Sequence, residues 1–105
     1  MEGIIVQKIF ITSEHQKDDQ SHPDSGNTDV IIVLKDGAKY TASFFTYDYI
    51  EHLRNMNMMT GEYLGGKYYW AKNMVLVEEC SPEIIKPVVM EIIEEGEFSE
   101  VFRRL

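Results

Sequence analysis

The sequence predicts an α+β domain, with an antiparallel sheet of about five strands in β-β-β-α-β-β-α order and two amphipathic helices. Two observations lead to this fold class. Short β-rich runs are joined by glycine turns, which connect antiparallel neighbours. Two longer segments, 46–59 and 81–95, repeat apolar residues with the helical period. A chain of 105 residues has the size of one small domain, so we expect a single domain over residues 1–105.

The first half of the chain predicts three strands. Residues 3–12 are β-branched and aromatic without a helical period, which is typical of a strand. Residues 13–28 contain no large apolar side chain and predict a long mobile loop. Residues 29–35 and 38–45 are the next two predicted strands. Asp36-Gly37 between them is a dipeptide favoured in two-residue hairpin turns.

A helix is predicted from Thr46, whose hydroxyl can cap the first turn, to Gly61, which can end it in the left-handed conformation. Its apolar face is expected to bury four residues: Tyr49, Ile50, Leu53 and Met56. Met58 points away from that face, so we interpret it as an exposed contact for a partner.

The stretch GGKYYWA, residues 65–71, combines a glycine pair and a lysine with three aromatic residues. A phosphate-binding loop requires a helix after the glycines, whereas β-prone aromatics follow them here. We therefore predict a Gly65-Gly66 hairpin turn and a strand over 67–70. Residues 74–79 are predicted as the last strand.

The second helix is predicted to begin at Ser81-Pro82, with serine as its cap, and to end at Gly96. Its expected buried arc contains six residues: Ile84, Ile85, Val88, Val89, Ile92 and Ile93. The last nine residues predict a short turn in which Phe98, Val101 and Phe102 face inward.

The net charge of −8 is concentrated near the C-terminus, where residues 78–100 carry eight glutamates against one lysine. This balance argues against nucleic acid and against anionic membranes as partners. The candidate contacts for a basic protein are Glu83, Glu91, Glu94 and Glu95. A solvated helix face that keeps the protein soluble is the alternative.

Cys80 is the single cysteine, so no internal disulfide can form, and a small buried side chain is the expected role. We find no spacing that indicates catalytic residues, metal ligands or a cofactor site. No apolar run is long enough to span a bilayer, and the N-terminus does not resemble a signal peptide. We therefore expect a cytoplasmic protein.

Several strands are apolar on both alternating faces, which predicts that something besides the helices covers one face of the sheet. A second copy of the chain is the simplest cover, so we predict a homodimer.

Residues 42–79 carry a strand ending in FFT, an amphipathic helix, a TGE turn and a GKY-aromatic-WA segment. In this pattern the chain resembles a group of small bacterial α+β proteins of unknown function, over about residues 29–102. The resemblance implies an intracellular bacterial protein. It implies no activity, cofactor or catalytic residue.

Three hypotheses for function remain open. The first is a non-enzymatic protein–protein interaction module, of the immunity or antitoxin kind, that masks a basic surface. The second is a small-ligand or enzymatic pocket between sheet and helix, lined by Tyr47, Tyr49, His52, Tyr68 and Trp70. The third is a structural or oligomerisation domain.

Overall fold

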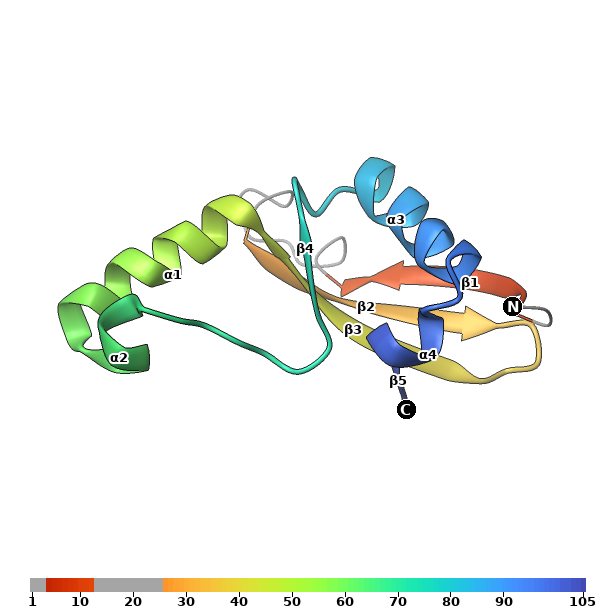
Figure 1. Cartoon of the computed structure of the whole chain (residues 1–105). Coiled ribbons are helices and arrows are strands. Elements are labelled where there is room, and N and C mark those ends of the chain that lie inside the picture. Colours follow the sequence, from red (N-terminus) through yellow and green to blue (C-terminus); the bar gives the residue numbers. More distant parts are fainter. Residues whose placement is uncertain (1–3, 13–25) are drawn as a thin grey trace.

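The computed structural model describes residues 4–12 and 26–105 and confirms the α+β class with a five-stranded sheet (Figure 1). The elements are β1 (Val6–Ile11), β2 (Asn27–Leu34), β3 (Lys39–Thr46), α1 (Tyr47–Thr60), α2 (Glu62–Gly66), β4 (Met74–Val77), α3 (Pro82–Glu94), α4 (Phe98–Val101) and β5 (Arg103–Arg104). Most of the predicted 13–28 loop lies outside the described residues. Its last two residues, Asn27 and Thr28, already belong to β2.

Strands β1, β2 and β3 form an antiparallel meander. The β2–β3 hairpin is confirmed, but its loop has three residues, 35–37, rather than two. Leu34 and Ala38 close the loop through a 2.8 Å backbone hydrogen bond, and Gly37 takes a φ of +92°. A two-residue Asp36-Gly37 turn of the expected type would require positive φ at both residues, and Asp36 does not have it.

The sheet is antiparallel as predicted except at β4, which pairs with β3 in parallel. Residues 47–73 connect the two strands, and a parallel pair requires a long crossover of this kind. β5 supplies the fifth strand by pairing with Tyr40 and Thr41 of β3. The predicted strand over 67–70 does not form, since β3 already pairs with β2 on one edge and with β4 and β5 on the other.

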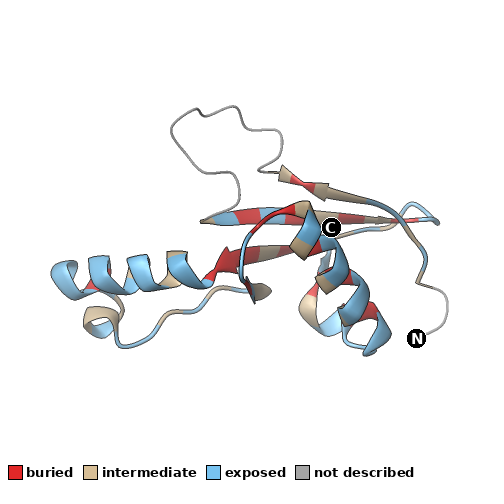
Figure 2. Cartoon of the chain, turned by 90° about the horizontal axis from the view of Figure 1, so that it is seen from above, coloured by how far each residue is buried: buried red, intermediate tan, exposed pale blue. Residues whose placement is uncertain are grey.

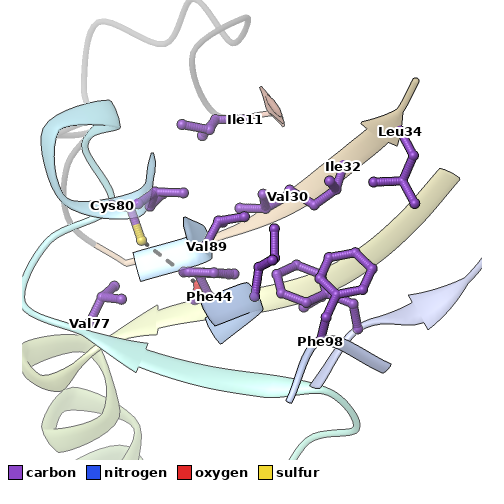
Figure 3. Packing of buried hydrophobic residues seen from close by; sticks show 13 residues of the cluster. Ile11, Val30, Ile32, Leu34, Phe44, Val77, Cys80, Val89 and Phe98 are labelled. Carbon is purple, nitrogen blue, oxygen red and sulfur yellow. Dashed lines mark hydrogen bonds between the residues drawn. The ribbon is translucent and has the colours of Figure 1, made fainter. Parts of the chain in front are cut away.

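The hydrophobic core lies between one face of the sheet and α3 with α4 (Figure 3). Ile85, Val89 and Ile93 of the predicted α3 arc are buried, and the other three residues of the arc pack at the edge of the core. Phe98 and Phe102 are buried as predicted, with their rings stacked 5.0 Å apart. The Cys80 thiol is also buried in this core.

The opposite face of the sheet carries Phe10, Ile31 and Val33, which are half-buried. Figure 2 shows α3 on one side of the strands, so this apolar set lies on the other side. The register places three basic residues on the same face: Lys8, Lys39 and Arg103.

Helix α1 does not pack on the sheet. It continues from the end of β3 and projects beyond the strands, and α2 folds back beneath it (Figure 1). We call residues 47–73 the arm. Asn57 is the residue of α1 that is fully buried, whereas Met56, which the sequence predicted to face the core, is exposed. The prediction for Met56 is wrong because the helical period identifies a face of the helix but not what covers it.

Candidate functional site

The four glutamates predicted to bind a basic partner, Glu83, Glu91, Glu94 and Glu95, are all exposed. Helix α3 places the first three on its outer side, and Glu95 is its C-cap residue. Among the described residues, the ion pair joins Glu51 and Arg54 of α1 at 3.1 Å. The glutamates of α3 therefore form no ion pair with a described basic side chain, although Lys86 lies on the same helix.

The arm exposes the other predicted contact, Met58, together with further large apolar side chains. The exposed set on the arm consists of Tyr47, Met56, Met58, Met59, Leu64, Tyr68 and Trp70. Met59 is 88% exposed and Leu64 is 69% exposed. Sequence reasoning missed both, since it expected a helix packed on the sheet and a hairpin at the glycines.

The five residues predicted to line a pocket between sheet and helix are distributed over the arm. Tyr49 and His52 lie together, with ring centroids 6.3 Å apart. Tyr68 packs instead against Tyr63 at 5.4 Å. Tyr47 and Trp70 are exposed, so these five side chains do not line one pocket between sheet and helix.

An aromatic cluster holds the base of the arm against the sheet. The Phe45 ring lies 6.1 Å from Tyr49 and 6.0 Å from Tyr69, and Tyr63 lies 5.0 Å from Tyr69. Burial raises the pKa of the Tyr69 hydroxyl above its usual value, and the neighbouring Tyr63 and Tyr49 add to this shift.

The tip of the arm is built on an unusual turn. Tyr63, Leu64 and Gly65 of α2 all have left-handed backbone angles, with φ values of 54°, 53° and 67°. For residues other than glycine this conformation costs about 1–2 kcal/mol each. The glycine pair is therefore not a hairpin turn: Gly65 completes the left-handed turn, and Gly66 (φ +84°) packs against α1.

Two adjoining hollows, of about 270 Å³ and 430 Å³, lie between α1 and residues 65–69. Both are lined by Arg54, Gly66 and Lys67. The smaller hollow adds apolar and aromatic side chains, among them Met74 and Tyr68, which is the one predicted pocket residue in the lining. Within the described residues neither lining contains an acidic side chain. Arg54 is paired with Glu51, whereas Lys67 forms no ion pair with a described residue, so Lys67 suits a ligand with an anionic group.

In residues 4–12 and 26–105 no three His, Cys, Asp or Glu side chains form a metal-binding group. The Cys80 Sγ lies 3.8 Å from the carbonyl oxygen of Phe44 inside the core, away from solvent. None of the helices in the described part of the chain has the length and apolarity to cross a membrane.

Comparisons of the chain with protein-family models, with curated proteins and with solved structures find no match. The resemblance to small bacterial proteins therefore stays a prediction. The arm, the acidic side of α3 and the two hollows are the surfaces that could bind a partner or ligand.

Proposed function

We propose that the chain is a non-enzymatic protein–protein interaction module that binds its partner through the arm. One observation carries the proposal. The arm projects from the sheet and exposes seven large apolar side chains on one short segment of the chain. Isolated apolar side chains are normal on a protein surface, whereas a gathered set of this kind marks an interaction site.

The composition of this surface supports the same conclusion. Methionine and aromatic residues are enriched in protein–protein interfaces, and the arm exposes three methionines, two tyrosines and a tryptophan. Methionine is flexible and fills irregular gaps, so it tolerates the shape of a partner well.

The acidic side of α3 supports a second contact in the same proposal. A basic protein would be attracted to Glu83, Glu91, Glu94 and Glu95, which fits an immunity or antitoxin-like role for this chain. Such attraction accelerates association and weakens as salt increases. The proposal places the protein in the cytoplasm, since a chain with one cysteine has no internal disulfide.

The test is a pull-down from native lysate at low and high salt with three forms of the tagged chain. The first is the wild type, the second is Met59→Glu on the arm, and the third is Glu91→Lys with Glu94→Lys. We expect a stoichiometric partner that Met59→Glu loses at either salt concentration. A partner lost at high salt and with the α3 variant would assign binding to α3 instead. Capture of neither a foreign protein nor an untagged copy of the chain would contradict the interaction module.

The hollows favour a second candidate function, the binding of a small anionic ligand. Arg54 and Lys67 would hold its carboxylate or phosphate, and Tyr68 and Met74 would pack on its apolar part. Thermal-shift measurements with carboxylates and phosphates test this candidate. We expect stabilisation of the wild type that a Lys67→Ala variant loses. Equal shifts in both forms would contradict it.

A further inference from the structure

The arm is electrically balanced although the chain is strongly acidic. It contains three acids, Asp48, Glu51 and Glu62, and three bases, Arg54, Lys67 and Lys72. The whole net charge of −8 therefore belongs to the rest of the chain. Most of that charge lies in residues 78–100, so two copies that meet at their arms avoid the repulsion that two acidic α3 helices would cause.

The arm buries few of its own side chains. Asn57 is its fully buried residue among those described, and the aromatic cluster at Phe45 is its main attachment to the sheet. At the tip, Tyr63 and Leu64 hold an unfavourable backbone conformation. A surface that is exposed, apolar and strained gains stability when a second protein covers it.

We propose that the partner covering the arm is a second copy of the chain, in a two-fold arm-to-arm contact. This inference rests on the proposed function, because it names the partner of the same surface. A two-fold contact uses the same patch on both copies, so the patch must tolerate its own charges. The arm meets this condition, since each copy offers acids and bases in equal number.

The face of the sheet opposite α3 is the other surface on which a second copy could lie. Its half-buried apolar residues include Phe10 and Ile31, but Lys8, Lys39 and Arg103 share that face. Asp29 is the one acid that the register places with them. A two-fold contact there brings basic side chains together, and this repulsion favours the arm over the sheet face.

The size of the arm is compatible with a stable dimer. Standard interfaces involve roughly 20–30 residues on each side. The arm spans residues 47–73, and Leu76, which is also exposed, extends its apolar surface at the base. The arm therefore has enough residues for one side of a standard interface.

Light scattering of the purified chain at micromolar concentration tests the inference. We expect the mass of two chains at low and at high salt, because an apolar, charge-balanced contact is little affected by screening. Met59→Glu places a charge in the apolar contact and should weaken dimerisation about tenfold or more. Met90→Glu is the matched control, since Met90 is an exposed methionine outside the arm, on α3. It should leave the mass unchanged.

Three outcomes would overturn the inference. One is the mass of a single chain for the wild type at every concentration and salt. Another is a dimer that Met59→Glu leaves intact, and the last is a dimer that Met90→Glu weakens equally. The proposed function fails separately. A single-chain mass together with a captured partner that Met59→Glu loses would keep the interaction module and exclude only the second copy.

Discussion

Gly66 of α2 lies directly against the backbone of Arg54 on α1. A methyl group on Gly66 would sit 2.6 Å from the carbonyl oxygen of Arg54 and 3.1 Å from the Cγ of Met58. Since the nearest atom belongs to the backbone, it cannot move aside as a flexible side chain would. This close approach holds the tip of the arm in place, and the positive φ of +84° at Gly66 adds a second requirement for glycine.

We predict that Gly66→Ala releases α2 from α1. The free energy of unfolding should fall by more than the roughly 1–2 kcal/mol that left-handed geometry alone costs. Gly61→Ala is the matched control, since Gly61 has a similar φ of +87° but open space around its Cα. Chemical denaturation of both variants measures the difference. Equal losses would show that the contact between Gly66 and Arg54 contributes nothing.

The strain at Leu64 leads to a prediction of opposite sign. Leu64→Gly removes the penalty of the left-handed conformation at an exposed side chain, so we expect unchanged or higher stability. Met59→Gly, at an exposed position in the right-handed part of the arm, should instead cost about 1 kcal/mol. Both changes remove an exposed apolar side chain of the arm. Any effect on self-association should therefore be similar in the two variants, and the difference in stability reports the backbone strain. A larger loss for Leu64→Gly would contradict the strain at this turn.

The two helix N-termini predict different responses to the loss of a hydroxyl. The Thr46 Oγ1 accepts hydrogen bonds from the backbone N–H groups of Tyr49 at 3.1 Å and Gly26 at 3.2 Å. Thr46→Ala should therefore lower stability by about 1–2 kcal/mol. Ser81 makes no capping hydrogen bond, and its buried hydroxyl has no partner among the described residues. Ser81→Ala should be neutral or stabilising, because it removes an unsatisfied buried group. Equal losses in thermal unfolding would contradict this difference.

The two helix N-termini show which features of the fold can be predicted from the sequence. Thr46 and Gly61 were predicted as the ends of α1, and both are confirmed, since capping depends on the residue itself and its nearest neighbours. Ser81 has the same local signature, yet its side chain makes no capping hydrogen bond. The apolar arc of α3 and the exposed glutamates were likewise predicted from the helical period alone.

The arm shows what the sequence could not give. The aromatics after Gly66 have the composition of a strand, but both edges of β3 are occupied, and edge occupancy depends on residues 74–77 and 103–104. The helical period of α1 is real, but nothing in it reveals that the helix projects beyond the sheet. Met58 was predicted to be exposed because it lies off the apolar face of the helix. Met59 and Leu64 were missed because their exposure depends on the projection of the arm.

The aromatic cluster at the base of the arm predicts a response to alkaline pH. In the folded protein the pKa of Tyr69 is raised above its ordinary value of 10.0, chiefly because burial disfavours the charged phenolate. A raised folded pKa contributes stability that is fully present below pH 10.0 and is lost as the pH rises through the folded value. Tyr69→Phe has no group to ionise there. The stability of the wild type relative to Tyr69→Phe should therefore decrease above pH 10.0, as measured by denaturation from neutral pH to about pH 11.

Tyr47→Phe controls for the removal of a hydroxyl from an exposed ring of the arm. A constant difference between the wild type and Tyr69→Phe over this range would show that Tyr69 is as well solvated in the folded chain as in the unfolded one.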